Sequence, residues 1–587
     1  MIEPKYYSLN ALFTGRVFRI PHYQRFYSWV KKQRDDLFSD LESLHKKGRD
    51  RHHFMATIVC YRTGEVRQVG SAEYGLYDVV DGQQRLTTLI ILLRAIHDKL
   101  EEGQDKTAIG NMLVKTDENL LLLQTNNANE RLFNDFLREG REPAEDDVKT
   151  YADRNLTRAI KECKQFVGQW TGSVGTLIDL LGLLRNRIGF VVYDTEDEQA
   201  VYTLFEVLNS RGLPVDPLDK CKTLLMGRAV ELSSTPGAAE SKTRELQKLW
   251  GRIYDEMALC HVSGVEILRV AATLLPESKG GKPPKADGAL DAFRKRVQQP
   301  QDAIGATEWL YDVAKGLVEL HKNPCWGPVA KILQARVLAV ALMVAKSLTE
   351  SERRKALAQW EKVTFRIYGL HRKDARTKVG DYVRLGRSVM RSEGPGSSYA
   401  NIMAAISTIG EDYPIEGAVA EVRRGECYEG FEDEARYILW RYEEHLAREA
   451  DAQVNEEMRA AIWAARSASE TIEHIFPQNP ERKGPWRGKV KSGGKKGAHV
   501  DSIGNMILLP PGLNSQAGNR GFEEKKAVYR KASGLRMITE VIERADWKAD
   551  EIASREERIS EWIRSEWADL PYDFPQQAGG GSVVLDI

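Results

Sequence analysis

The sequences TIEHIFPQN at residues 471–479 and SIGNMILLP at residues 502–510 decide how the C-terminal part of the chain is organised. Each contains a short apolar run rich in isoleucine, leucine or phenylalanine, which predicts a strand, and a proline ends the first run. A long polar connection separates the two predicted strands. A carboxylate, an imidazole and side-chain amides stand where the strands end, and this mixture is typical of phosphodiester hydrolysis with one metal ion.

His474 is the expected general base, because a neutral imidazole accepts a proton from water near neutral pH. Adjacent residues on a strand point to opposite faces, so Glu473 could hold a metal while the imidazole faces the water. Carboxylate and amide oxygens suit a hard divalent cation, Mg²⁺ or Mn²⁺, which neutralises charge on the phosphate and on the leaving oxygen.

The composition is that of a soluble globular protein with several domains. The chain has 587 residues, of which 42% are hydrophobic and 29% are charged. This length suits about three to four domains. Because 85 basic and 85 acidic residues give a net charge of zero, binding of nucleic acid would depend on local basic patches.

The six cysteines are scattered and form no CxxC pair, which is typical of reduced thiols in a cytosolic protein and argues against zinc. The N-terminus lacks the charged and apolar regions of a signal peptide, and no apolar run of about 18 residues occurs. We therefore expect a cytoplasmic protein with no membrane partner.

The segment IPHYQRFYSW at residues 20–29 mixes aromatic and polar side chains, and its proline predicts an extended backbone. Tyr23, Gln24 and Arg25 could stack on a base and hold a phosphate. For this segment taken alone, the favoured interpretation is that its aromatic side chains anchor it to the core.

The sequence DGQQR at residues 81–85 lies between a predicted strand at residues 76–80 and an apolar helix at residues 86–100. This arrangement puts backbone N–H groups and an arginine at a helix N-terminus, where phosphates bind. The spacing matches neither a Walker loop nor a dinucleotide fingerprint, so an ordinary capped turn is an equal alternative. The candidate nucleotide-binding residues are Asp81, Gly82, Gln83, Gln84 and Arg85.

A third polar cluster, FEVLNSRG at residues 205–212, follows a predicted helix and ends at a glycine and a proline. Asn209 and Arg211 could complete a nucleotide pocket. They would do so together with Arg25 and Arg85. A C-capping turn is the alternative interpretation of this cluster.

Residues 231–425 are predicted to be mainly helical and to form a connector. This region carries one basic patch with interleaved tyrosines and few acids, for which contact with DNA and a solvated surface are equally weighted interpretations. The patch comprises Arg366, Arg372, Lys373, Arg376, Lys378, Arg384, Arg387 and Arg391.

The connection between the two quoted strands is basic and rich in glycine. Cations beside a hydrolytic centre suit the backbone of DNA, and a flexible solubilising loop is the alternative. Lys525, beyond the strands, is a further candidate for a phosphate contact. The candidates within the connection are Arg482, Lys483, Arg487, Lys489, Lys491, Lys495 and Lys496.

The motifs IPxYQRxYxW, DGQQRLTTL and FEVLNSRG, in this order, resemble the DUF262 domain, which is related to the ParB and sulfiredoxin fold and is associated with nucleotide hydrolysis. The sequences EHIFPQN, SIGNMILLPPGLN and GFEEK closely resemble DUF1524, a branch of the HNH, or His-Me finger, nucleases. The resemblance implies an α+β multidomain chain. Its parts are a ParB/sulfiredoxin-like domain at residues 1–230, a helical connector at residues 231–425 and an HNH nuclease domain at residues 426–587.

The resemblance to HNH domains also implies a role for each nuclease residue. His474 is the base, Glu473 and Asn514 are metal ligands, and Asn505 braces the loop that holds the base. Taken alone, His474 is better interpreted as a structural histidine. Its occurrence in order with Asn505 and Asn514 favours a catalytic role instead. A glutamate where commoner HNH domains have aspartate or histidine leaves open whether this ligand binds directly or through water.

A DUF262 domain followed by DUF1524 is the arrangement of GmrSD-type, or type IV, restriction enzymes, among them BrxU and SspE. The resemblance implies an endonuclease that depends on or responds to ATP or GTP and attacks modified double-stranded phage DNA. A nucleotide-hydrolysing sensor of modified DNA with weak nicking activity is the alternative. We expect a homodimer, because one nuclease centre per chain must cut two strands.

Overall fold

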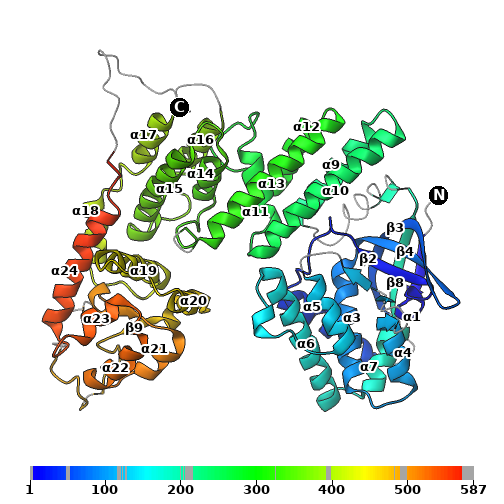
Figure 1. Cartoon of the computed structure of the whole chain (residues 1–587), viewed down its shortest axis with the longest axis horizontal. Coiled ribbons are helices and arrows are strands. Elements are labelled where there is room, and N and C mark those ends of the chain that lie inside the picture. Colours follow the sequence, from blue (N-terminus) through cyan, green and yellow to red (C-terminus); the bar gives the residue numbers. More distant parts are fainter. Residues whose placement is uncertain are drawn as a thin grey trace. The chain divides into compact units, whose positions relative to one another are not determined.

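The chain folds into two compact units, which appear in the computed structural model in Figure 1. The connector expected at residues 231–425 is divided between these units. The N-terminal unit comprises Met1–Ala272 and Pro284–Val318, and the C-terminal unit comprises Thr273–Pro283 and Glu319–Ile587. The structure describes residues 4–47, 53–115, 120–121, 123–125, 129–197, 200–201, 204, 216–323, 326–391, 398–481, 483–489 and 499–571.

The N-terminal unit contains a six-stranded mixed sheet, beside which helix α3 lies in Figure 1. Strands β3 and β4 form an antiparallel hairpin, whose turn contains Gly70 at a φ of +58°. The pairs β3–β8, β2–β4 and β2–β7 are parallel, and β1 is antiparallel to β8. In spatial order the strands are β1 (Lys5–Ser8), β8 (Ile188–Thr195), β3 (His53–Val69), β4 (Ala72–Asp81), β2 (Arg16–Ile20) and β7 (Leu123–Thr125).

Helix α3 (Gln83–Lys99) is buried on nearly every side, in agreement with the apolar helix predicted here. It contacts α6 (Tyr151–Ser173) and α7 (Leu177–Asn186), which lie beside it in Figure 1. The strand, glycine and helix predicted around DGQQR are therefore confirmed, and the core holds the first turn of α3 firmly. The other helices of ten or more residues in the described part of this unit are α2 (Lys31–Lys46), α4 (Gln104–Leu113), α5 (Glu130–Glu139), α9 (Pro217–Glu231), α10 (Pro236–Leu259), α11 (Gly264–Thr273), α12 (Ala286–Arg296) and α13 (Pro300–Lys322).

The C-terminal unit is mainly helical and contains a short antiparallel hairpin, whose strand β9 lies beside α21 in Figure 1. The hairpin consists of β9 (Ile472–His474) and β10 (Met506–Leu508), which confirms the two strands predicted from the apolar runs. The helices are α14 (Leu333–Val344), α15 (Glu350–Thr364), α16 (Val379–Met390), α17 (Tyr399–Ile409), α18 (Ile415–Val422), α19 (Glu432–Glu449), α20 (Glu456–Ala464), α21 (Pro511–Ala517), α22 (Phe522–Tyr529), α23 (Arg536–Ile542) and α24 (Ala549–Glu566).

A buried carboxylate joins the helices that precede the hairpin to those that follow it. Glu361 of α15 accepts hydrogen bonds from the Tyr437 hydroxyl at 2.6 Å and from Trp567 Nε1 at 3.0 Å. Arg441 lies 3.3 Å from the same oxygen. Because a buried carboxylate is stable only when it is hydrogen-bonded or paired, these contacts fix α15 against α19 and against the end of α24.

The basic patch predicted in the connector is largely paired inside the C-terminal unit. Arg376 binds Asp374 at 2.7 Å, and Lys378 binds Asp412 at 2.7 Å. Arg366 is buried and donates to the carbonyl of Trp567 at 3.1 Å. These contacts favour the structural interpretation of the patch over contact with DNA.

None of the helices in the described ranges combines the length and the apolar character that are needed to cross a bilayer.

Candidate functional site

Asn505 ties together the two segments that flank the hairpin. In β9 and β10, His474 is paired with Met506, and all six hairpin residues are buried. The Asn505 side-chain oxygen Oδ1 accepts from the Phe476 N–H at 2.8 Å and from Trp547 Nε1 at 3.1 Å. Its amide nitrogen donates to the carbonyls of Phe476 at 2.9 Å and Val500 at 2.8 Å. The backbone after the histidine therefore has a fixed path.

The His474 imidazole is held by a carboxylate that the sequence did not single out. Its Nε2 lies 3.1 Å from Asp501 Oδ1, and the same oxygen accepts from Gln478 Nε2 at 3.0 Å. The Tyr428 ring and the imidazole pack in a T-shaped arrangement, with centroids 4.5 Å apart. Burial raises the pKa of Asp501, but the hydrogen bonds from His474 and Gln478 outweigh it and leave this pKa below its ordinary value.

Glu473 lies in a buried ion pair. Its Oε1 accepts from Lys525 Nζ at 2.6 Å and from the Tyr529 hydroxyl at 2.8 Å. Burial raises the pKa of Glu473 and lowers the pKa of Lys525, and their mutual attraction offsets only part of each shift. The contacts come from α22, which therefore holds β9 in place.

The prediction that Lys525 contacts a phosphate is wrong. Its side chain is fully buried, and its ammonium donates to Glu473 and, at 2.7 Å, to the carbonyl of His474. A cation with no exposed surface has no access to the DNA backbone. Lys525 instead neutralises a buried carboxylate, which the spacing of the sequence motif does not reveal.

Glu473 and Asn514 have oxygens that suit a divalent cation. Asn514 Nδ2 donates to the carbonyls of Glu470 at 2.9 Å and Ile472 at 3.3 Å, which places this side chain beside the start of β9. Among the described residues, neither Asn514 Oδ1 nor Glu473 Oε2 accepts a hydrogen bond. Both are hard ligands, so the two residues fit Mg²⁺ or Mn²⁺.

A cation bound by these two residues would need further oxygen ligands. The described ranges contain no group of three or more histidine, cysteine, aspartate or glutamate side chains arranged to hold a metal. Mg²⁺ is commonly bound through one or two carboxylates, with water and substrate phosphate oxygens completing its shell.

Only part of the basic connection after β9 is described. Lys483 and Arg487 are exposed, whereas Lys489 is paired with Asp546 at 2.5 Å. Trp486 between them is buried and donates to the carbonyl of Arg520 at 2.9 Å, so the described part of the connection is anchored. The candidates Arg482, Lys491, Lys495 and Lys496 lie outside the described residues.

In the N-terminal unit, Gly82 makes the turn from β4 into α3. Its φ is +94°, and a Cβ atom there would lie 3.1 Å from Ile58 Cγ1 and 3.2 Å from the Thr57 carbonyl oxygen. Only glycine adopts this backbone conformation readily in so narrow a space. The start of α3 therefore lies closely against β3.

Gln24 and Gln84 are braces between the predicted nucleotide motifs. Gln84 accepts from the Ser28 N–H at 2.8 Å and donates to the Phe26 carbonyl at 3.1 Å. Gln24 donates to the Val80 carbonyl at 3.2 Å. It accepts from Lys222 Nζ at 2.8 Å. Because both ends of each amide are engaged, the prediction that these side chains contact a nucleotide is corrected to a structural role.

Tyr23 is buried, so the structure favours the interpretation that the aromatic side chains of this segment anchor it to the core. Lys222 Nζ lies 3.3 Å from the Tyr23 carbonyl oxygen, and α9 is therefore joined to the segment at two points. A ring covered in this way does not offer a face for stacking on a base.

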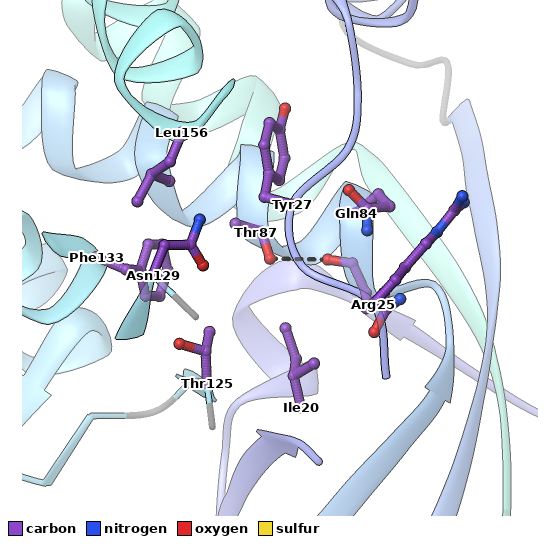
Figure 2. A pocket seen from close by; sticks show the side chains of 10 residues that line it. Ile20, Arg25, Tyr27, Gln84, Thr87, Thr125, Asn129, Phe133 and Leu156 are labelled. Atoms are coloured by element: carbon purple, nitrogen blue, oxygen red, sulfur yellow. Dashed lines mark hydrogen bonds between the residues drawn. The ribbon is translucent and has the colours of Figure 1, made fainter. Parts of the chain in front are cut away.

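Arg25 lines a small hollow whose polar atoms are incompletely paired. Figure 2 shows Thr125 and Asn129 facing the start of α3 across this hollow. Among the described residues, the buried atoms Gln83 Oε1 and Thr125 Oγ1 have no hydrogen-bond partner. Arg25 Nε makes no hydrogen bond within the same residues, although it lies 3.3 Å from Asp219. The free space is about 10 Å³, enough for roughly one water molecule. A nucleotide would have to widen the hollow or bind at its rim.

The two arginines of the predicted nucleotide motifs, Arg25 and Arg85, have different surroundings. Arg25 lies 3.3 Å from Asp219 and 3.7 Å from Asp216, so two carboxylates hold its guanidinium. Arg85 lies over the Trp29 ring, 5.9 Å from its centroid, and makes no hydrogen bond or ion pair within the described ranges. Burial lowers the pKa of Arg85 and raises that of Asp81. A nearby anion would relieve the cost of burying Arg85.

The remaining two nucleotide candidates, Asn209 and Arg211, lie outside the described residues. Sequence reasoning also gave no role to Asp501, Thr125 or Asn129. A signal for Asp501 was present, because it stands immediately before the second quoted strand sequence. Thr125 and Asn129 carry no comparable signal, since only the fold brings them to the hollow.

Two family models match the chain. The GmrSD restriction endonuclease N-terminal domain matches residues 9–226, which include all three predicted nucleotide motifs. The GmrSD restriction endonuclease C-terminal domain matches residues 420–562, which include both strands of the hairpin and all four nuclease candidates. The two matches occur in the order that these domain names imply. A search of curated proteins found no match.

Proposed function

The chain belongs to the GmrSD restriction endonucleases, and we propose that it cleaves modified foreign double-stranded DNA by metal-assisted hydrolysis under control of a bound NTP. The observation that supports this best is the His474 imidazole, which is held at Nε2 by Asp501 while Nδ1 has no hydrogen-bond partner among the described residues. The proposed place of action is the cytoplasm, where phage DNA arrives.

The nuclease residues divide the chemistry between them. His474 takes a proton from the attacking water through Nδ1. Asn505 keeps the surrounding backbone in position, and Lys525 and Tyr529 hold Glu473 through one oxygen. A divalent cation bound by Glu473 and Asn514 would neutralise charge on the phosphate and on the leaving oxygen.

The regulatory part of the proposal concerns Arg25 and Arg85. Their guanidinium groups suit the phosphates of ATP or GTP. Gln83 Oε1 and Thr125 Oγ1, which make no hydrogen bond to the residues that the structure describes, suit polar atoms of the same ligand. Asp81 and Gly82 shape the turn that presents the N-terminus of α3.

Arg85→Ala should weaken NTP binding at least about tenfold, because a charged hydrogen bond contributes roughly 1.5–3 kcal/mol.

A cleavage assay tests the whole proposal. The substrates are paired phage genomes that differ only in base modification, with Mg²⁺ or Mn²⁺ and with ATP or GTP varied independently. Cleavage of only the modified genome, stimulated by NTP, is expected. His474→Ala should abolish cleavage and leave NTP hydrolysis intact. Normal cleavage by this variant would show that another group is the base.

A homodimer is the proposed assembly, since a duplex has two strands and each chain has one candidate nuclease centre. Sedimentation of the protein with and without DNA measures this directly. A monomer in both conditions would contradict it.

The sensor alternative has one observation in its favour. Glu473 already pairs with Lys525, so its carboxylate is less available to a metal than an unpaired one, and a weak nuclease would result. In that case modified DNA should stimulate NTP turnover strongly while producing only slow nicking. Measuring turnover and nicking on the same DNA separates the two functions.

A further inference from the structure

Asp501 is the carboxylate that contacts the His474 imidazole in the described part of the chain. Its Oδ1 accepts from His474 Nε2 at 3.1 Å and from Gln478 Nε2 at 3.0 Å. The backbone carbonyl of Asp501 accepts from the Cys427 N–H at 2.8 Å. Tyr428, which follows Cys427 in the chain, packs its ring against the imidazole. Both the carboxylate and the ring it holds are therefore fixed from several sides.

This contact determines which nitrogen of the neutral imidazole carries the proton. An ionised carboxylate only accepts hydrogen bonds, so the nitrogen that faces it must be the donor. His474 Nε2 therefore carries the hydrogen, and Nδ1 keeps its lone pair. Nδ1 makes no hydrogen bond to the residues that the structure describes, so this lone pair can receive a proton from water.

We propose that Asp501 is a positioning residue for the nuclease reaction, which holds His474 in the Nε2–H tautomer and aims Nδ1 at the attacking water. The proposal rests on the proposed function of His474 as the base. In the step itself, the water O–H bond breaks, its proton moves to Nδ1, and the water oxygen bonds to phosphorus as the leaving oxygen departs with its electron pair. Asp501 remains ionised throughout and stabilises the imidazolium.

The positions of the side chains argue against Asp501 as a metal ligand. It lies on the imidazole, whereas Glu473 is the neighbour of His474 on β9 and turns to Lys525 on α22. Asp501 Oδ1 is already occupied by two donors. A positioning role and a ligand role make different predictions for metal dependence, which the experiment below uses.

The test compares Asp501→Ala and Asp501→Asn with Asp433→Ala, in which an ion-paired carboxylate elsewhere in the same unit is removed. Asp501→Ala should slow single-turnover cleavage by about 10- to 100-fold, because the base is no longer held in one tautomer and general base catalysis as a whole contributes about 10²- to 10⁴-fold. Asp501→Asn keeps an oxygen acceptor but loses the negative charge that stabilises the imidazolium, so it should recover only part of this loss. DNA affinity and the metal concentration needed for half-maximal rate should not change, and Asp433→Ala should behave as the parent protein.

A second measurement does not depend on cleavage. The tautomer is measured by NMR in protein labelled with ¹⁵N-histidine, at a pH where the ring is neutral. The His474 signals are identified by their loss in His474→Gln. The parent protein should show the Nε2–H tautomer, and Asp501→Ala should show a mixture of both tautomers. An unchanged tautomer in Asp501→Ala overturns the proposal, as does a tenfold rise in the metal requirement.

The two measurements keep this proposal distinct from the proposed function. If the parent protein cuts no DNA under any condition but Asp501→Ala still alters the tautomer, the nuclease function fails and the positioning of His474 stands. If cleavage is normal in Asp501→Ala, the nuclease function stands and the positioning role fails.

Discussion

At the scale of single residues, the pair of Lys525 and Glu473 should be the most sensitive point of the C-terminal unit. Lys525→Met leaves a buried carboxylate without its cation, which costs about 3–5 kcal/mol of the free energy of unfolding. Urea denaturation measures this loss. The neighbouring Lys526 pairs with Glu523, whose side chain is 73% exposed, so Lys526→Met should cost less than about 1 kcal/mol. Equal effects of the two substitutions would contradict the prediction.

Lys222 should give the N-terminal unit a pH-dependent stability. Burial lowers its pKa to about 8 from an ordinary value of 10.5, and the charge of Asp219 opposes this only in part. Between these two pH values the unfolded chain binds more protons than the folded chain, so stability rises with pH across this window. The rise should reach roughly 3 kcal/mol, and Lys222→Met should remove it. Urea denaturation at several pH values checks this, and a constant difference between parent and variant would refute it.

At the scale of secondary-structure elements, the turn between β4 and α3 should tolerate no side chain. Gly82→Ala combines an unfavourable φ of +94° with contacts near 3.1 Å, and we expect a loss of more than about 1 kcal/mol. Gly70→Ala is the matched control, because its φ of +58° is also unfavourable but no atom of the described residues lies within 4 Å of the added Cβ. Thermal denaturation should show the larger loss for Gly82→Ala, together with weaker NTP binding. Similar losses at both positions would mean that crowding at Gly82 is unimportant.

Elements were easier to predict from the sequence than contacts between them. The apolar runs in the two quoted sequences predicted β9 and β10, and apolar residues around DGQQR predicted α3, because periodicity encodes local structure. Pairing is not local. Lys525 becomes buried only when α22 packs under β9, and Lys378 is neutralised by Asp412, which lies 34 positions away. For this reason, counting basic residues in the sequence overestimates the number of cations that are free to contact DNA.

At the scale of the whole molecule, equal numbers of acidic and basic residues leave no long-range attraction for DNA. Affinity must then come from cations that have no acidic partner. The described residues of the basic connection include two exposed cations, Lys483 and Arg487, whereas Lys489 and the residues of the connector patch are mostly paired. A neutral chain with a few unpaired cations should bind DNA weakly until the modified site and the metal add further contacts.

This distribution of charge predicts how binding depends on salt. Each phosphate neutralised by a cation contributes about −0.9 to the slope of log affinity against log salt concentration. Substituting both Lys483 and Arg487 by glutamine should therefore reduce the slope by about 2, measured by fluorescence anisotropy without divalent metal so that the DNA stays intact. The control replaces Arg376 and Lys378 by glutamine. Because these two cations are paired with Asp374 and Asp412, the control should leave the slope unchanged. If the control alters the slope and the first double variant does not, DNA lies on the connector patch and not beside the hairpin.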